Sequence, residues 1–367
     1  MMMAHKIIIS GGGTGGHIFP AIAIANALRA IDPTVEILFV GAHGRMEMEK
    51  VPAAGYQIKG LDIQGINRQS LFKNLLLPFK LISSLWTSRR IIKEFKAEVA
   101  VGVGGFASGP LLMAANMMGI PTLIQEQNSY AGVTNKRLGG KAKKICVAYE
   151  QMERFFPTDK LLLTGNPVRR ASVEIHGKRE EAHLHFGIKT TKKTILVTGG
   201  SLGANTLNTC VRQALGKLQE ADIQVIWQCG SYYVDSLQAD LEGELSENVK
   251  LMPFLQRMDY AYAAADIVIS RAGAGTISEL CVVGKPVVLV PSPNVAEDHQ
   301  TKNADALVRK GAAVMIKDRE ATDILMTTVL NLLDHPEQCA SLGREINKMA
   351  KLDADVNIAN EVLKLIR

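Results

Sequence analysis

Cysteine and aromatic residues are scarce in this chain of 367 residues. The five cysteines are scattered and include no Cys-x-x-Cys pair, so neither a disulfide framework nor a zinc site is indicated. Aromatic residues make up 5% of the chain, and abundant Gly and Ala favour an α/β architecture over an all-β one. No run approaches the roughly 20 apolar residues of a membrane-spanning helix. Because no signal-peptide pattern precedes the first predicted strand, we expect the protein to stay in the cytoplasm.

Two ligand-binding signatures are also missing. No Gly-Lys-Ser or Gly-Lys-Thr follows a glycine-rich turn, so the chain has no Walker-type phosphate loop. The turn after the second predicted strand reads Gly41-Ala42-His43 and lacks the acidic residue that holds a dinucleotide's ribose, which disfavours a redox cofactor. The one Asp-x-Asp triplet, Asp353-Ala354-Asp355, opens a predicted terminal helix, where capping explains it. We therefore expect neither a metal ion nor a cofactor.

What the sequence does contain is a strand, a glycine-rich turn and a helix near its start. The uninterrupted β-branched run Ile7-Ile8-Ile9 is typical of a strand buried on both faces, and Pro20 suits the first turn of a helix. Between them lies Gly11-Gly12-Gly13-Thr14-Gly15-Gly16-His17. Glycines let the backbone approach a ligand, so N–H groups at the helix start could bind phosphate, although a tight turn alone also explains the pattern.

The same pattern returns twice along the chain. Val99 to Val103 leads into a glycine turn that begins at Gly104, and Thr194 to Thr198 leads into the turn from Gly199 to Ala204. Such a duplication is typical of two α/β units, each built around a parallel sheet. It predicts two Rossmann-like, doubly wound domains that present the carboxyl ends of their strands to one shared cleft.

A polar, charged segment separates the two predicted domains. It follows Gly165-Asn166-Pro167 and runs to about Lys193. We expect an N-terminal domain of residues 1–165, a C-terminal domain of residues 166–350, and a terminal helix, 351–367, whose packing the pattern leaves open. The formal net charge of +6 suggests anionic partners, but an excess of this size also fits a solvated surface.

The richest stretch of the second half runs from Ser270 to Glu279, directly after a predicted strand. Its small residues open a helix whose first N–H groups could bind a diphosphate, and Glu279, one turn in, could accept both hydroxyls of a ribose. Alternatively, the stretch only caps the helix, and Glu279 complements the helix dipole. The other glycine turns, expected at the same cleft, favour the nucleotide interpretation.

Six blocks of this kind follow one another along nearly the whole chain. They are Gly12 to His17, Gly104 to Pro110, Glu126-Gln127-Asn128, Gly165 to Arg169, Gly199 to Ala204 and Glu297 to Gln300. Each block is shared with other glycosyltransferases of the two-Rossmann (GT-B) type, but the set resembles the bacterial N-acetylglucosaminyltransferases that convert lipid I to lipid II in peptidoglycan synthesis. The resemblance implies UDP-N-acetylglucosamine as donor, lipid I as acceptor, and no nucleic acid among the partners.

The resemblance also implies which residues bind the substrates. In this family the donor binds mainly in the second domain, where Leu255 would pack against the uracil and Gln300 would hold sugar hydroxyls. From the first domain, the glycine turn and Asn128 would close over the donor. The implied substrate-binding residues are Thr14, Gly15, Gly16, Asn128, Arg169, Ser201, Leu255, Ala274, Gly275, Thr276, Glu279 and Gln300. Gln125 departs from the family, which often has histidine at that position.

The reaction so implied is an inverting transfer, in which the C4 hydroxyl of the acceptor's N-acetylmuramoyl unit displaces UDP and forms a β1→4 bond. The hydroxyl must lose its proton, and His17, the histidine of the first glycine turn, is the first candidate for the base. His17 could instead bind the acceptor diphosphate or cap the helix, and Glu126 is the rival base. Arg169, Ser201 and helix N-termini could stabilise the leaving diphosphate without a metal.

A long helical stretch from Leu71 to Lys96 mixes large apolar residues with six Lys and Arg residues. It is either a core helix with a solvated face or a basic, apolar surface that docks on an anionic bilayer. In the resembling family a patch of the first domain has the membrane role. We therefore expect a peripheral protein on the cytoplasmic side of the plasma membrane.

Two other functions fit the same patterns. A UDP-N-acetylglucosamine epimerase of similar two-domain fold would need neither a lipid acceptor nor a membrane-facing patch. A protein that only binds a nucleotide sugar or a lipid diphosphate would carry the same glycine turns without catalysing a reaction.

Overall fold

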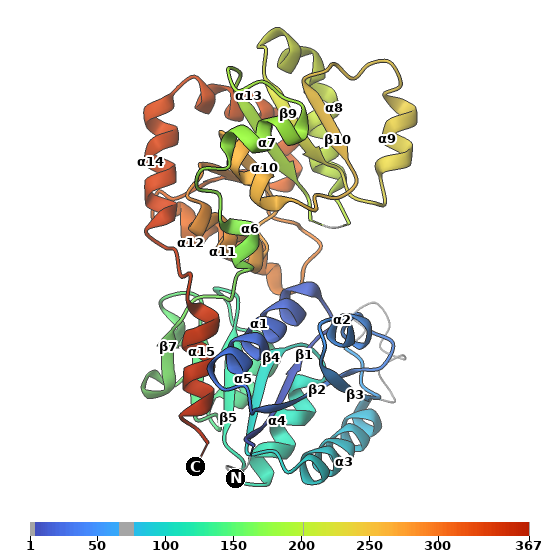
Figure 1. The fold of residues 1–367 in the computed structure, drawn as a ribbon, viewed down its shortest axis with the longest axis vertical. Helices are drawn as coiled ribbons and strands as arrows, with labels where there is room; N and C mark the ends of the chain where they lie inside the picture. Colours follow the sequence, from blue (N-terminus) through green and yellow to red (C-terminus); the bar gives the residue numbers. More distant parts are fainter. Residues whose placement is uncertain (1–3, 66–76, 201, 367) are drawn as a thin grey trace. The chain divides into compact units, whose positions relative to one another are not determined.

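The computed structural model describes residues 4–65, 77–200 and 202–366. Its contacts divide the chain into two compact units. The N-terminal unit consists of Met1–Val168 and Leu352–Arg367, and the C-terminal unit of Arg169–Lys351. Each unit has its own parallel β-sheet with helices packed on it (Figure 1). The predicted fold class, with two doubly wound α/β sheets, is confirmed.

The sheet of the N-terminal unit has seven strands in the order β3-β2-β1-β4-β5-β6-β7, and all neighbours pair in parallel. The strands are β1 (Lys6–Gly11), β2 (Glu36–Ala42), β3 (Gln57–Leu61), β4 (Val99–Gly104), β5 (Thr122–Glu126), β6 (Lys144–Val147) and β7 (Leu161–Leu163). The order reverses between β1 and β4, and doubly wound sheets bind ligands beyond the carboxyl ends of their strands at this switch point.

Helices cover both faces of this sheet. They are α1 (Gly15–Ile31), α2 (Glu47–Ala53), α3 (Leu77–Phe95), α4 (Ser108–Met117), α5 (Val133–Gly139) and α15 (Ala354–Leu363), with short 3-10 helices η2 (Met152–Arg154) and η3 (Thr158–Lys160). The terminal helix α15 lies along α1, red beside blue in Figure 1. Ile358, Ala359 and Val362 are buried in the same core as the apolar residues of α1. The last helix of the chain thus packs on the first.

The C-terminal unit repeats the arrangement with six parallel strands in the order β10-β9-β8-β11-β12-β13. The strands are β8 (Thr194–Thr198), β9 (Gln224–Gln228), β10 (Val249–Met252), β11 (Ile267–Ser270), β12 (Val287–Leu289) and β13 (Val314–Met315). This order corresponds to the first six strands of the N-terminal unit. Its switch point lies between β8 and β11, the two strands that precede the glycine turn at Gly199 and the stretch from Ser270 to Glu279.

The helices of the C-terminal unit are α6 (Arg170–Val173), α7 (Arg179–Phe186), α8 (Asn205–Glu220), α9 (Val234–Asp240), α10 (Met258–Ala264), α11 (Ala274–Val283), α12 (His299–Val308), α13 (Ala321–Leu333) and α14 (Pro336–Asn347), with η4 (Ala296–Asp298) and η5 (Asp318–Glu320). Trp227 of β9 is fully buried, and its indole N–H donates to the Asn208 side chain of α8 at 2.9 Å. This polar contact fixes α8 on the sheet, because an unpaired indole N–H would be costly in the interior.

Helix α3 carries the described part of the basic, apolar stretch, whose residues 71–76 lie outside the described residues. Ser84, Ser88, Ile91 and Ile92 form its buried side, whereas Phe79 and Trp86 are each 71% exposed. A core helix with a purely polar outer face does not account for these exposed rings. Within the described residues, no helix is both long enough and apolar enough to cross a membrane.

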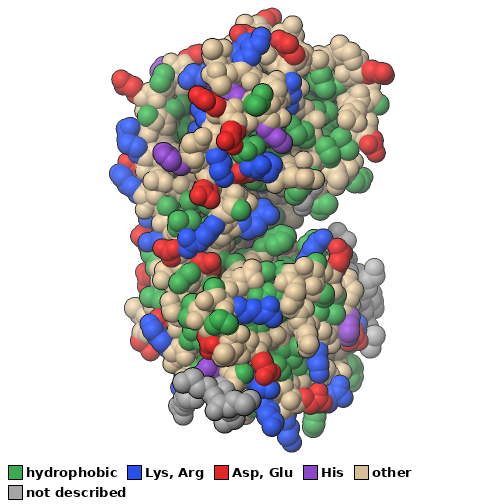
Figure 2. Space-filling view, viewed as in Figure 1, with side chains coloured by type: hydrophobic (Ala, Val, Ile, Leu, Met, Phe, Trp, Pro, Cys, Tyr) green, Lys and Arg blue, Asp and Glu red, His purple; other side chains and the backbone are tan. Residues whose placement is uncertain are grey.

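The charged side chains do not gather in one place on the face seen in Figure 2. Lys and Arg are interspersed there with Asp and Glu over both units. The net charge of +6 therefore gives no single basic patch on this face, and local arrangements of charge matter more than the total.

Candidate functional site

The glycine turn of the N-terminal unit is held by hydrogen bonds from within the protein. The Gly12 N–H donates to the Gly104 carbonyl at 3.3 Å, and the Gly13 N–H donates to Glu47 Oε2 at 2.9 Å. Gly13 has φ +82°, a conformation that other residues rarely adopt. Because these two amides are used internally, an anion at this turn would have to bind the amides of Thr14, Gly15 and Gly16, at the start of α1.

His17 lies in the first turn of α1 and is half-buried. Its Nδ1 is 3.1 Å from the Gly12 carbonyl oxygen and 3.2 Å from Thr14 Oγ1. A carbonyl can only accept, so Nδ1 carries a hydrogen, and the neutral ring has its lone pair on Nε2. The Nε2 edge lies against Gly104, where a Cβ would come within 2.8 Å of Nε2. Glycine at position 104, with φ +103°, leaves room for the imidazole.

Glu126 ends strand β5 and is buried, with both carboxylate oxygens occupied by N–H donors. Oε1 accepts from the Asn128 backbone at 3.0 Å and from the Asn128 amide at 3.4 Å. Oε2 accepts from the Gly132 N–H at 3.0 Å and from the Asn135 amide at 2.8 Å. The carboxylate thus organises the loop after β5 and fixes the Asn128 side chain, which is only half-buried.

The stretch after β11 forms a helix N-terminus as the sequence indicates. Gly273 is the N-cap of α11 and has no side chain to cap the helix. The first N–H of the helix with a carbonyl partner one turn earlier is that of Ile277, which donates to the Gly273 carbonyl at 2.9 Å. Ala274, Gly275 and Thr276 are the first three residues of α11, so their N–H groups have no carbonyl one turn earlier. Three half-buried amides at the positive end of a helix dipole suit an anionic ligand.

Glu279 lies in the second turn of α11, too far along the helix to act as a cap. Its Oε2 accepts the Tyr262 hydroxyl of α10 at 3.2 Å, and its Oε1 lies 3.9 Å from Nε of the exposed Arg169. Burial raises the pKa of the Glu279 carboxyl, and Arg169 and the Tyr262 hydroxyl only partly offset this effect. The capping interpretation of Glu279 is therefore not supported by its position.

Gln300 of α12 accepts hydrogen bonds from two loops beside the start of α11. Its Oε1 accepts the Ala272 N–H at 3.2 Å and the Ser292 N–H at 2.9 Å. Within the described chain its Nε2 has no hydrogen-bond partner, so the amide can donate to a ligand hydroxyl.

Leu255, by contrast, has its side chain inside the core at 3% exposure, and its neighbour Phe254 is exposed instead. A ligand could reach the Leu255 backbone rather than its side chain.

Ser201 lies outside the described residues, but the turn around it is described. Gly200 and Gly203 both have positive φ, and the Gly203 N–H donates to the Gly200 carbonyl at 2.9 Å. A Cβ at Gly203 would overlap the Cys229 carbonyl oxygen. This turn therefore requires glycine for its close approach to the end of β9.

Three side chains that the sequence did not single out hold parts of these sites in place. Glu47 accepts from the first glycine turn, Tyr262 donates to Glu279, and Arg271 donates to the carbonyls of residues 290 and 291 and pairs with Asp318. Glu47 and Arg271 stand out only because they are charged residues with little solvent exposure, and that exposure is known only from the tertiary structure.

Among the described residues, no group of three His, Cys, Asp or Glu side chains could hold a metal ion.

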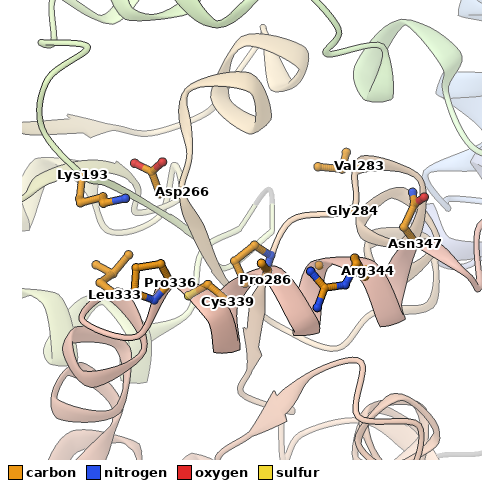
Figure 3. A pocket seen from close by; sticks show the side chains of 12 residues that line it. Lys193, Asp266, Val283, Gly284, Pro286, Leu333, Pro336, Cys339, Arg344 and Asn347 are labelled. Carbon is orange, nitrogen blue, oxygen red and sulfur yellow. The ribbon is translucent and has the colours of Figure 1, made fainter.

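A separate hollow of the C-terminal unit, with a volume of about 580 Å³, lies between α14 and the sheet. Figure 3 shows Lys193 and Asp266 on one side of it and Pro336, Cys339 and Arg344 of α14 on the other. Lys193 and Asp266 immediately precede β8 and β11, so the hollow is at the amino ends of these strands. Doubly wound sheets bind their ligands at the opposite end, which argues against this hollow as the main site.

Two doubly wound parallel sheets, with glycine-rich turns and an open helix start after the strands at their switch points, are the arrangement expected of a glycosyltransferase of the GT-B class. The comparison with known families agrees and is more specific. Residues 7–147 match the glycosyltransferase family 28 N-terminal domain, and residues 194–358 match the glycosyltransferase family 28 C-terminal domain. The chain belongs to glycosyltransferase family 28.

Close relatives cover the chain from end to end. A protein of Parabacteroides distasonis is 56% identical over 365 residues, covering 100% of this chain and 99% of the relative. A protein of Phocaeicola vulgatus is 58% identical over 362 residues, covering 98% of this chain and 96% of the relative. Both relatives are named UDP-N-acetylglucosamine–N-acetylmuramyl-(pentapeptide) pyrophosphoryl-undecaprenol N-acetylglucosamine transferase.

Solved structures separate the transferase from the epimerase alternative. The crystal structure of Acinetobacter baumannii MurG is 30% identical, with a TM-score of 0.80 over 98% of this chain and 99% of that chain. A UDP-GlcNAc 2-epimerase from Neisseria meningitidis is 17% identical, with a TM-score of 0.65 over 98% of this chain and 100% of that chain. The likeness to the epimerase extends to the fold alone.

Proposed function

We propose that this protein transfers N-acetylglucosamine from UDP-N-acetylglucosamine to the C4 hydroxyl of the N-acetylmuramoyl unit of lipid I, with inversion, to form lipid II. The observation that carries the proposal is the identity of 56% and 58%, along whole chains, to relatives whose names specify this donor and acceptor. The arrangement of polar groups at the two switch points supports it. The C-terminal unit offers groups that suit the donor's diphosphate and ribose, and the N-terminal unit offers a candidate base for the acceptor's hydroxyl.

The C-terminal unit is proposed to bind the donor. The amides of Ala274, Gly275 and Thr276 take the diphosphate, and Glu279 accepts the ribose hydroxyls. The largely buried Glu279 carboxylate already has one donor, Tyr262, and a bound ribose would supply further donors that stabilise its charged form. Arg169 and Ser201 stabilise the leaving diphosphate, Gln300 donates to a sugar hydroxyl, and the backbone of Leu255 contacts the uracil.

The N-terminal unit is proposed to hold the acceptor and to remove its proton. Nε2 of His17 takes the proton of the C4 hydroxyl as the new C–O bond forms and the bond to UDP breaks. The geometry favours His17 over Glu126, because both carboxylate oxygens of Glu126 already accept from the four N–H groups that shape the loop. Thr14, Gly15 and Gly16 supply amides beside the base, and Asn128 is the polar side chain that Glu126 directs.

The N-terminal unit is also proposed to dock on the membrane through α3. Phe79, Ile82 and Trp86 are spaced three and four residues apart, so they lie on one face of the helix, and all three are exposed. Arg89 and Lys93 follow on the same helix and form no ion pair within the described residues. Apolar rings beside unpaired cations suit an anionic bilayer, which is where a polyprenyl acceptor resides.

Identification of the product tests the proposed transfer. Purified protein is incubated with UDP-N-acetylglucosamine and a lipid I analogue with a shortened lipid chain, and the product is examined by NMR. The proposal predicts one new disaccharide with a β1→4 linkage. A product in which the donor sugar is epimerised, or an α linkage, would contradict it.

A further inference from the structure

Glu47 is a buried carboxylate that the proposed reaction does not use. It is 1% exposed, and each of its oxygens accepts one backbone N–H: Oε1 from Ala42 at 3.0 Å and Oε2 from Gly13 at 2.9 Å. Within the described residues it pairs with no Lys, Arg or His. A buried charge without a cation is costly for the folded protein, so its presence beside the glycine turn needs an explanation.

The chain leaves space for this side chain at two glycines. A Cβ at Gly12 would overlap the Glu47 carboxylate, and a Cβ at Gly41 would lie 2.5 Å from Glu47 Cγ. The first glycine belongs to the turn before α1 and the second to β2. Both segments therefore enclose the carboxylate closely, and a bulkier residue at either position would displace it.

One peptide group connects Glu47 to His17. The peptide between Gly12 and Gly13 donates its N–H to Glu47, and its carbonyl accepts from Nδ1–H of His17 at 3.1 Å. The bond is trans, as are all peptide bonds described, so the N–H and the carbonyl point in opposite directions. A carboxylate on the N–H side polarises the group and makes the carbonyl a stronger acceptor.

We propose that Glu47 is a positioning residue that acts on His17 through the Gly12–Gly13 peptide. The relay of carboxylate, peptide and imidazole keeps the proton on Nδ1, directs the lone pair to Nε2, and stabilises the imidazolium that forms when Nε2 takes up a proton. Glu47 exchanges no proton itself and touches no substrate. This inference rests on the proposed role of His17 as the base, but the relay itself is a property of the protein without substrate.

Other charged groups surround α1, and none of them shares this connection. They are Lys6 of β1, Glu49 and Lys50 of α2, Asp355 and Glu361 of α15, and Arg45 in the turn before α2. Strand β4 contributes none. Lys6 pairs with Glu36, Glu49 with Lys50, and Glu361 with Lys364. The Arg45 guanidinium lies 6.0 Å from the centre of the Phe106 ring. Glu49, exposed on the same helix as Glu47, therefore serves as the matched control.

The first test measures the His17 ring directly and needs no substrate. The ring signals of full-length protein are followed by NMR as a function of pH, and the His17 signal is assigned by its absence in His17→Gln. Removing the negative charge destabilises the imidazolium, so the midpoint of the His17 titration should shift to lower pH in Glu47→Gln. Glu49→Gln should leave this midpoint unchanged. An unchanged midpoint in folded Glu47→Gln would overturn the relay, whether or not the protein is a transferase.

The second test separates positioning from simple support of the fold. In Glu47→Gln we expect kcat to fall on the order of tenfold, with KM for UDP-N-acetylglucosamine within about twofold of the original value. The same substitution in a His17→Ala background is expected to change kcat little further, because the residue it acts through is gone. Equal losses in both backgrounds would contradict the proposal. If Glu47→Gln does not fold, Glu47→Asp, whose shorter side chain weakens the contact, is expected to shift the His17 midpoint in the same direction by less, and no shift would overturn it.

Discussion

The hydroxyl of Tyr262 donates a hydrogen bond to the Glu279 carboxylate across 3.2 Å, from one helix of the C-terminal unit to another. Tyr262 is fully buried, and burial holds the pKa of its hydroxyl well above the usual value. The hydroxyl therefore stays protonated and remains a donor. It orients one oxygen of Glu279 and leaves the carboxylate with the capacity to accept further hydrogen bonds.

Glu279→Gln is expected to stabilise the protein without ligand at neutral and alkaline pH. The folded-state pKa of Glu279 is raised, so the ionised carboxylate lowers folding stability above that pKa, and the penalty is relieved as pH falls through it. Glutamine keeps an oxygen for Tyr262 but carries no charge. The gain in melting temperature over the original protein should thus be larger at pH 8 than near pH 5. A loss of stability at pH 8 would contradict this account.

The same substitution should weaken donor binding. Hydrogen bonds to a charged group contribute about 1.5–3 kcal/mol, so we expect the affinity for UDP-N-acetylglucosamine to fall about tenfold to a hundredfold by calorimetry. Glu181→Gln is the control, because Glu181 accepts from Tyr260 at 2.9 Å in an exposed pair of the same chemistry. If the two substitutions lower the affinity for UDP-N-acetylglucosamine equally, the proposed contact between Glu279 and the ribose is contradicted.

His17→Ala and Glu126→Gln should fail in different ways. Loss of a general base lowers kcat by roughly a hundredfold to ten-thousandfold, and the half-buried imidazole contributes little to folding, so His17→Ala should melt close to the original temperature. Glu126→Gln replaces an acceptor that serves four N–H groups, and each unsatisfied buried group costs about 1–3 kcal/mol. It should melt clearly lower. If instead Glu126→Gln loses kcat but keeps its melting temperature, and His17→Ala melts lower but keeps kcat, Glu126 is the better candidate for the base.

Trp86→Glu should weaken binding to vesicles that contain anionic lipid. It places a negative charge on the exposed apolar face of α3, and sedimentation with the vesicles should fall by about tenfold or more. Turnover of a water-soluble acceptor should stay the same. Leu184→Glu is the control, since Leu184 is an exposed apolar residue of the C-terminal unit. If both variants lose vesicle binding equally, α3 is not the docking surface.

Gly203→Ala should destabilise the C-terminal unit and weaken donor binding together. Its Cβ would overlap the Cys229 carbonyl, and φ +82° disfavours any residue with a side chain. We expect a loss of about 1–3 kcal/mol in the free energy of unfolding. Gly216→Ala, in the interior of α8 with open space around it, should instead stabilise by about 0.5–1 kcal/mol. Urea unfolding of both variants measures the contrast.

The sequence predicts the strands and turns because their causes are local. A β-branched run such as Ile7-Ile8-Ile9 needs burial on both faces, and the glycine turns after β1, β4 and β8 mark where the backbone bends sharply. Two such sets, in order, are enough to predict two doubly wound sheets. The terminal helix could not be placed, because its apolar face fits either unit until α1 supplies the partner.

The supporting side chains escape such prediction because their partners are distant in sequence. Glu47 lies 34 residues from Gly13, and Arg271 lies 47 residues from Asp318. Glu126 illustrates the opposite difficulty: its motif marks it as important, but only the donors from Asn128, Gly132 and Asn135 indicate that it shapes the loop. Leu255 is adjacent to an exposed phenylalanine, and the sequence does not say which of the two faces a ligand.

The most direct measurement is release of UDP from UDP-N-acetylglucosamine by the purified protein, in buffer that contains EDTA, with and without a lipid I analogue. The account predicts release that depends on the analogue, persists in EDTA, and matches the disaccharide formed mole for mole. Release at the same rate without the analogue, or complete loss of release in EDTA, would contradict it.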